Sequence, residues 1–218
     1  MWLKRSLRLQ SIDRIAPVRA TAAWMVWMGL AMSPMTGSAD SIELETPEET
    51  IQEMANNVLA YLEFDRENLE ADRASLDAMV AEQILPHFEF RYASRLILGK
   101  HFKGATPEQR DEFADAFSSY LVRVYGHTVL RVNRETLTVL GPGTGTDADK
   151  ATVKTRIIMA DGTEVPVDFR MARIDGYWKI WDVVARGVSY VRTYREDFGV
   201  VIANDGLDHL NAFLRTPK

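Results

Sequence analysis

The sequence has no cysteine among its 218 residues. A chain without thiols cannot form disulfides, use a cysteine nucleophile or bind a metal through a thiolate. The stability of the fold must therefore come from a hydrophobic core that is large enough without covalent cross-links. Because 46% of the residues are hydrophobic, the chain has the composition of a globular protein with such a core.

Motifs for metal, phosphate and acyl chemistry are missing as well. The four histidines are too far apart to form a metal-ligand pattern, so no metal is expected: His87, His101, His127 and His209. No G-x-S-x-G motif of a serine hydrolase occurs. The glycine-rich GPGTGTDADK at 141–150 lacks the Gly-Lys-Ser/Thr ending of a phosphate loop, and we interpret it as a turn between two strands.

Acidic residues are scarce in the first 39 residues, which are net positive although the whole chain has a net charge of −5. This leader holds five basic residues, namely Lys4, Arg5, Arg8, Arg14 and Arg19, and one acidic residue, Asp13. A weakly polar run at 20–35 follows, with Gly37 and Ala39 in the small-residue positions of a cleavage site. The order predicts a secretory signal peptide at 1–39 that is cleaved after Ala39. An uncleaved membrane anchor is the alternative, although a spanning helix needs about 20 apolar residues.

Removal of the leader makes the mature chain, residues 40–218, more acidic than the whole. An acidic chain has no general attraction for nucleic acid or for anionic membrane surfaces. We therefore expect an exported, periplasmic protein with no nucleic-acid partner.

Helical periodicity dominates the first part of the mature chain. Thr46-Pro47-Glu48-Glu49 is a capping box, and an apolar stripe with helical spacing follows it. Further helices are predicted at 69–85, which Pro86 ends, and at 88–98. A second box at Thr106-Pro107-Glu108-Gln109 begins a long helix at 107–131.

The period then changes from 3.6 to 2, which indicates strands at 135–140, 153–159, 164–171 and 177–185. Helices at about 188–203 and 206–214 follow. The pattern predicts one α+β domain at 40–218. In it, N-terminal helices and the long helix pack on a twisted four-stranded antiparallel meander, a cone-like arrangement of the NTF2-like type, and two C-terminal helices close it.

Asp182 is the best candidate for an acid or base. We expect its side chain to share a face with Trp178, Ile180 and Val184, where an ionised carboxylate needs hydrogen bonds. The N–H groups of residues 187–189, at the start of a helix, are the predicted donors. The alternative is an isomerase- or dehydratase-like enzyme in which Asp182 works beside Tyr190 or Tyr194.

Two segments resemble the MlaC family of periplasmic lipid carriers in the Mla, or toluene-tolerance, ABC transport pathway. They are LGKHFKGATPEQRDEFADAFSSYLVRVYGHTV at 98–129 and WKIWDVVARGVSYVRTYREDFGVVIANDGLDHLNAFL at 178–214. The resemblance covers roughly residues 45–214. Two residues depart from it: Phe102 stands where the family resemblance leads us to expect tryptophan, and Tyr190 where it leads us to expect leucine or methionine.

The resemblance implies a monomeric shuttle and no enzyme. It implies phospholipid as cargo, no other cofactor, and maintenance of outer-membrane lipid asymmetry. It also implies two partners, an inner-membrane ABC transporter complex and an outer-membrane lipoprotein complex. A hopanoid or sterol-like lipid is the alternative cargo, and a structural adaptor with a filled core is the alternative function. From the facing apolar stripes we predict these lipid-binding residues: Leu96, Leu98, Phe102, Phe117, Leu121, Tyr125, Val167, Phe169, Trp178, Val184, Val188 and Tyr194.

Overall fold

The structure is a computed structural model, and it describes residues 45–131, 137–143, 147–158 and 162–216. Contacts join residues 43–218 in one unit. The predicted signal peptide at 1–39 lies outside the described residues, so its cleavage stays a prediction. Within the part of the chain that the structure describes, no helix is both long and apolar enough to cross a membrane.

Helices α1 (Pro47–Ala71) and α2 (Arg73–Gln83) each begin at a side chain that caps them. The Thr46 hydroxyl accepts a hydrogen bond from the Glu49 N–H, and the Glu49 carboxylate accepts one from the Thr46 N–H, which confirms the first capping box. Asp72 separates the two helices and accepts from the N–H groups of Ala74 and Ser75. The helix predicted at 69–85 is thus divided between α1 and α2.

Shorter helical segments lead to the helix that the second capping box begins. They are η1 (Leu85–His87), α3 (Phe90–Leu98) and η2 (Gly99–Gly104), followed by α4 (Pro107–Tyr125) and η3 (Gly126–Arg131). Thr106 and Gln109 make both hydrogen bonds of the predicted box. The predicted helix at 107–131 is α-helical only to Tyr125, and the last six residues form the tighter 3-10 helix η3.

The sheet is an antiparallel meander whose strands are adjacent in chain order. They are β1 (Leu137–Pro142), β2 (Lys150–Ile158), β3 (Glu164–Ile174), β4 (Tyr177–Ala185) and β5 (Val188–Ser189). The prediction of four strands is wrong, because the short β5 pairs with the end of β4. Arg186 and Gly187 have positive φ angles and fold the chain back before the next helix begins.

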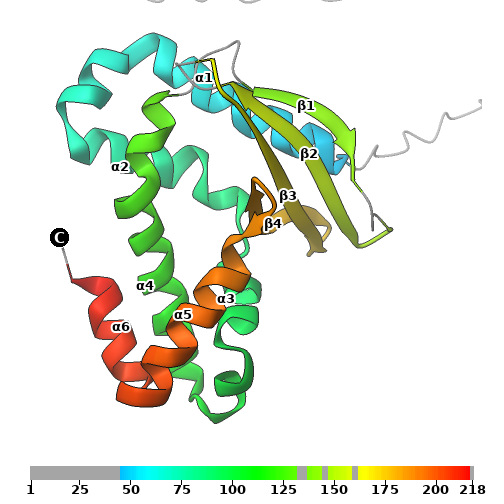
Figure 1. Cartoon of the computed structure of the whole chain (residues 1–218). Coiled ribbons are helices and arrows are strands. Elements are labelled where there is room, and N and C mark those ends of the chain that lie inside the picture. The colour runs from blue at the N-terminus through cyan, green and yellow to red at the C-terminus, as the bar shows by residue number, and fades with distance from the viewer. Residues whose placement is uncertain (1–44, 132–136, 144–146, 159–161, 217–218) are drawn as a thin grey trace, which may run out of the picture. The chain divides into compact units, whose positions relative to one another are not determined.

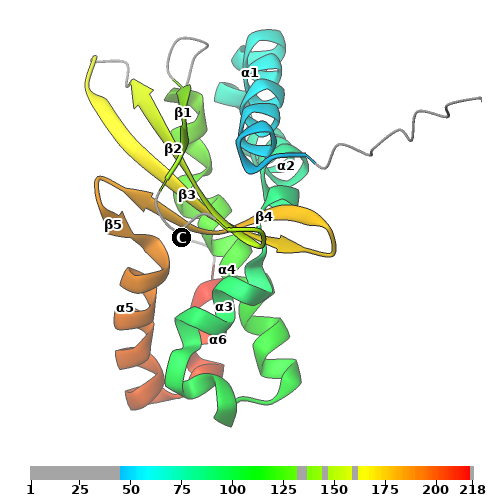
Figure 2. The same cartoon turned by 90° about the vertical axis from the view of Figure 1, so that its right-hand side faces the viewer.

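Two closing helices, α5 (Tyr190–Asp205) and α6 (Leu207–Arg215), confirm the predicted end of the domain. Figures 1 and 2 show the elements in two groups: the sheet with α1 and α2 at one end, and α3, α4, α5 and α6 at the other. Helix α4 extends from the second group to the first, where it contacts α2. Each group has its own buried core, around Phe113 and Leu210 in the helices and around Val153 and Ile180 in the sheet.

The cap of α4 offers a test of the fold. Replacing Thr106 by alanine is expected to lower the free energy of unfolding by about 1 kcal/mol, because the Gln109 N–H loses its acceptor. For a domain of this size that lowers Tm by about 2–4 °C in a thermal melt. Thr106→Ser keeps the hydroxyl and should melt like the parent protein. An alanine variant as stable as the parent would show that the box contributes nothing.

Candidate functional site

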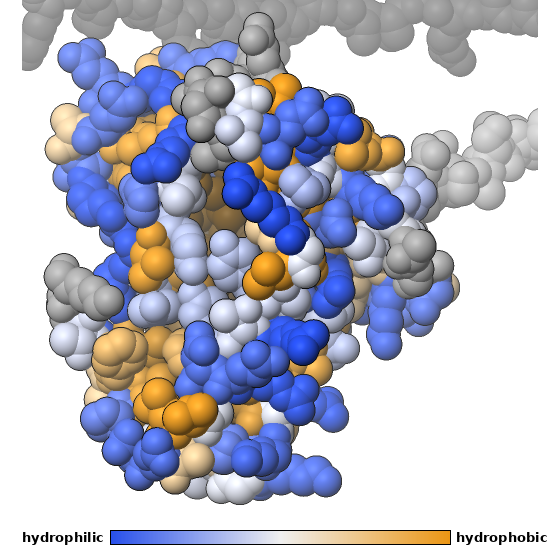
Figure 3. Space-filling model, in the orientation of Figure 1, coloured by the Kyte–Doolittle hydropathy of each residue, from blue (hydrophilic) through white to orange (hydrophobic). Residues whose placement is uncertain are grey.

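A large apolar cavity lies between the helices and the sheet. Its volume is about 550 Å³, and its lining comes from α1, α2, η1, α3, α4, η3, the sheet and α5. This volume is within the range of about 300–1,000 Å³ that is usual for ligand sites. On the face drawn in Figure 3, a recess with hydrophobic residues at its bottom is surrounded by mostly polar surface.

The helical wall of the cavity consists of apolar and aromatic side chains from α4 and α5. Phe117, Leu121 and Tyr125 are four residues apart on α4 and therefore form one stripe. Tyr190 and Tyr194 have the same spacing on α5 and meet that stripe. The rings of Phe117 and Tyr194 are 5.1 Å apart, and those of Tyr125 and Tyr190 are 5.5 Å apart, both pairs edge to face.

The sheet wall uses alternate residues of β3 and their partners on β4. Val167 and Phe169 point into the cavity from β3, together with Val165. Directly opposite residues on antiparallel strands share a face, so Val183, opposite Phe169, and Ala185, opposite Val167, join them. This wall is continuous with the buried core around Ile180.

A register shift at Trp181 decides which residues of β4 reach this wall. Ile180 is opposite Met171, but Asp182 is opposite Arg170, so Trp181 is an extra residue. The prediction that Asp182 and Val184 share a face with Trp178 and Ile180 is therefore wrong. Beyond Trp181, the β4 side chains on the cavity side are those of Val183 and Ala185, so Val183 takes the place on the wall that we assigned to Val184.

The segment around η1 completes the lining with Ile84, Leu85 and Phe88. Two hydrogen bonds fasten it to β4. The Glu89 N–H donates to the Ile180 carbonyl oxygen at 2.8 Å, and the Lys179 ammonium group donates to the Pro86 carbonyl oxygen at 2.7 Å. The segment is thus held against the sheet at one edge of the cavity.

Asp182 is buried, and its carboxylate accepts three structural hydrogen bonds. It accepts from the Ser189 hydroxyl at 2.7 Å, from the Val191 N–H at 3.0 Å and from the Arg170 guanidinium group at 3.1 Å. The prediction that an N–H group at the start of a helix donates to Asp182 is confirmed, but the donor is Val191 and not one of residues 187–189. These three bonds join β3, β4 and the start of α5 through one carboxylate and give Asp182 a structural role beside the cavity.

The structure brings together six of the twelve residues that we predicted to bind lipid. Those that line the cavity are Phe117, Leu121, Tyr125, Val167, Phe169 and Tyr194. The other six lie elsewhere: Leu98 in the helical core, Phe102 packed against that core, Trp178 in the sheet core, Leu96 half-buried on α3, Val184 buried past the register shift and Val188 exposed on β5. Contact of any of the twelve with lipid stays a prediction.

Sequence reasoning missed the η1 segment and all the β4 residues that line the cavity. Ile84 ends the stripe of Leu76 and Val80 on the helix predicted at 69–85. Pro86 interrupts helical periodicity after it, so Leu85 and Phe88 belong to no continuous stripe. A helix-breaking proline between large apolar residues was the available signal, because such residues are seldom left in water. For Val183 and Ala185 no local signal exists, since the shift at Trp181 depends on pairing with β3.

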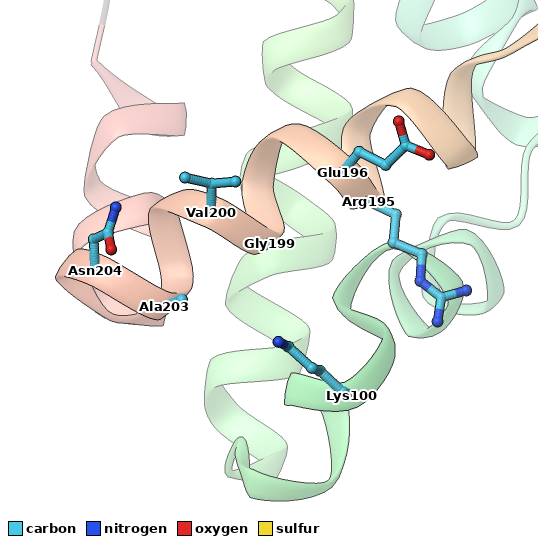
Figure 4. Close-up of a pocket in the computed structure, with 7 residues that line it drawn as sticks. All are labelled: Lys100, Arg195, Glu196, Gly199, Val200, Ala203 and Asn204. Atoms are coloured by element: carbon cyan, nitrogen blue, oxygen red, sulfur yellow. The ribbon is translucent and has the colours of Figure 1, made fainter.

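A second hollow, of about 400 Å³, is lined by η2 and α5 and shares no lining residue with the large cavity. Lys100 extends from η2, and Arg195 and Glu196 from α5, beside the small residues Gly199 and Ala203 (Figure 4). With three charged side chains among its lining, this hollow suits hydrocarbon chains far less well than the large cavity does.

The pKa of His87, in η1, offers a test of how that segment is held. Burial lowers this pKa, and repulsion by Lys179 lowers it further, against a smaller opposing effect of Glu53. The folded-state pKa is then below the unfolded one, so the unfolded chain binds more protons. Stability is expected to be complete above about pH 6.5 and to fall as the pH drops below that value. Urea unfolding at pH 7.5 and 5.5 should show a smaller difference in His87→Gln than in the parent. An equal difference would contradict the assignment.

Two relatives and one solved structure are similar to this chain. Toluene tolerance protein ttg2D of Pseudomonas putida is 27% identical over 171 residues, which cover 77% of this chain and 78% of the relative. The intermembrane phospholipid transport system binding protein MlaC of Haemophilus influenzae is 20% identical over 191 residues, with 86% and 89% covered. The solved structure of a phospholipid-binding protein from Ralstonia solanacearum, in complex with a phospholipid, matches with a TM-score of 0.69 at 24% identity, covering 79% of this chain and all of that one.

The fold and the cavity define an α+β protein built around a large apolar cavity. The chain belongs to the MlaC protein family, whose model matches residues 52–216. This confirms the resemblance drawn from the two sequence segments.

Proposed function

We propose that this protein is a periplasmic carrier that binds phospholipid in the large cavity and shuttles it between two membranes. The observation that carries the proposal is the apolar chamber of about 550 Å³ between α4, α5 and the sheet. The family membership supports it, and so do the names of the relatives, one of which is a binding protein of an intermembrane phospholipid transport system.

The physical argument concerns the cost of exposing acyl chains to water. At roughly 0.8 kcal/mol per CH₂, two chains with about 30 apolar carbons gain about 24 kcal/mol gross on leaving water. Such a ligand does not dissociate into water at a useful rate. It moves only between apolar hosts of similar free energy, so a soluble carrier must dock on membrane complexes. We propose an outer-membrane lipoprotein complex and an inner-membrane ABC transporter complex as these partners, on the family resemblance.

An enzymatic role has less support. Asp182 is engaged with Ser189, Val191 and Arg170, and burial raises the pKa of Tyr194 above its usual value, so that phenol stays protonated. The carboxylate thus joins three structural elements, and the phenol acts as a donor rather than as a base.

The direct experiment is native mass spectrometry of protein purified from a periplasmic extract without detergent. We expect an added mass equal to bound phospholipid, and the same lipid in an organic extract. A hopanoid or sterol-like mass would show that the cargo is a different lipid and that the protein is still a carrier. A uniformly ligand-free protein with no lipid in the extract would contradict the proposal.

A further inference from the structure

Two phenol hydroxyl groups meet inside the apolar cavity. Tyr125, the last residue of α4, and Tyr194, on α5, both line it, and their hydroxyl oxygens are 3.0 Å apart in a hydrogen bond. Tyr194 is only 7% exposed. Phe117, Leu121 and Val191, which also line the cavity, offer no side-chain acceptor, and Tyr190 offers only a third phenol, whose ring lies 5.5 Å from that of Tyr125.

Counting protons shows that the pair has one donor to spare. Two hydroxyl groups carry two protons, and their mutual hydrogen bond uses one. Among the residues that the structure describes, no other group accepts a hydrogen bond from either phenol. A donor without an acceptor in a largely apolar cavity loses free energy, so the second proton is best satisfied by an acceptor that arrives with the ligand.

The surroundings determine what kind of acceptor fits. Burial and the hydrogen bond to Tyr125 raise the pKa of Tyr194, so the pair remains neutral and donates. Burying a charged phosphate beside neutral phenols would be costly, whereas an uncharged oxygen would not. In a diacyl phospholipid the uncharged acceptors nearest the hydrocarbon are the ester carbonyl oxygens. Arg131, which ends η3 six residues beyond Tyr125, is exposed and lines the cavity, and it suits the phosphate better.

We propose that the Tyr125–Tyr194 pair is a hydrogen-bond donor site for an ester carbonyl of the bound lipid and makes the carrier selective for ester-linked lipid. This deepens the proposed function and rests on it. The pair acts on binding alone, and no bond of the lipid changes.

The presence of two hydroxyl groups predicts different results for the single variants and for the double variant. In Tyr125→Phe the hydroxyl of Tyr194 loses its partner but keeps its own proton, and Tyr194→Phe leaves Tyr125 in the same state. Each single variant therefore retains one donor. The double variant Tyr125→Phe/Tyr194→Phe retains none, although its rings still pack.

The experiment is a competition between two phospholipids with the same headgroup and chain length, one diester-linked and one diether-linked. Full-length mature protein, stripped of lipid, is offered an equimolar mixture in mixed micelles, and the bound masses are compared by native mass spectrometry. The parent protein should favour the diester lipid by about 3- to 10-fold, the contribution of one hydrogen bond. Both single variants should keep the preference, and the double variant should bind both lipids equally.

Tyr120→Phe is the matched control. Its ring contacts that of Tyr194 at a centroid distance of 6.2 Å, but Tyr120 does not line the cavity. It should leave the preference unchanged. If Tyr190→Phe removed the preference and the double variant did not, the proposal would be overturned, because Tyr190 would then be the donor.

A second measurement needs no variant. With carbon-13 at the ester carbonyls, the infrared carbonyl band of the lipid bound to the parent protein should lie at lower frequency than in a dry apolar solvent. A band at the free-carbonyl frequency overturns the proposal, even if the double variant fails to fold. Equal binding of the two lipids by the parent overturns this inference alone, whereas binding of neither lipid overturns the proposed function with it.

Discussion

Replacing Leu121 by aspartate is expected to abolish lipid retention while leaving the protein folded. Leu121 lines the cavity from the middle of the α4 stripe and is only partly buried. In the empty protein a carboxylate at this position faces space that water can occupy, so its charge stays hydrated. With lipid bound it would be an unpaired charge against hydrocarbon, which costs several kcal/mol, or about 100-fold or more in affinity.

The matched control for this variant is Leu210→Asp. Leu210 is fully buried in the helical core and does not line the cavity. The same charge there has no water beside it, and we expect about 3–5 kcal/mol of destabilisation or outright unfolding. Thermal melts and lipid extraction of both variants separate the two effects. A Leu121→Asp protein that unfolds like Leu210→Asp would show that the space is filled core, and one that keeps its lipid would place the ligand elsewhere.

The second large effect is expected at Asp182, in stability and not in binding. Asp182→Asn replaces one carboxylate oxygen by an NH₂ group, which is a donor. In one orientation of the amide this donor faces the Ser189 hydroxyl and the Arg170 guanidinium group, and in the other it faces the Val191 N–H. Losing charge-assisted hydrogen bonds at a buried position should lower the free energy of unfolding by about 2–4 kcal/mol. At a temperature where the variant is folded, bound lipid should persist.

Asp168→Asn is the control for Asp182→Asn. Asp168 is half-buried on the neighbouring strand β3, and the same change there should alter stability by no more than about 0.5 kcal/mol. If Asp182→Asn melted like the parent and instead lost at least about 100-fold of a catalytic turnover, Asp182 would be a general acid or base and the carrier account of this residue would be wrong.

What the sequence predicts well is local. The capping boxes at Thr46 and Thr106 place the starts of α1 and α4 because cap and helix lie within a few residues of each other. The stripe of Phe117, Leu121 and Tyr125 is equally local, since helical spacing alone puts these side chains on one face. For the same reason the change of period after η3 reveals the sheet.

What the sequence does not reveal depends on partners far along the chain. The shift at Trp181 arises from pairing with β3, and it moves Val184 off the cavity wall and Val183 onto it. The hydrogen bond between Tyr125 and Tyr194 joins residues 69 positions apart. Burial alone does not separate cavity lining from filled core either, which is why Leu98 and Trp178 appeared equivalent to residues that face the chamber.

The central claim is that the chamber between α4, α5 and the sheet holds the hydrocarbon of the lipid. Its most direct test is photo-crosslinking with a phospholipid that carries a diazirine at the end of one acyl chain, followed by peptide mapping. The account predicts adducts on cavity-lining peptides of α4, β3, β4 and the first half of α5. Adducts confined to the hollow beside Lys100 and Val200, or spread over the exposed surface, would contradict it.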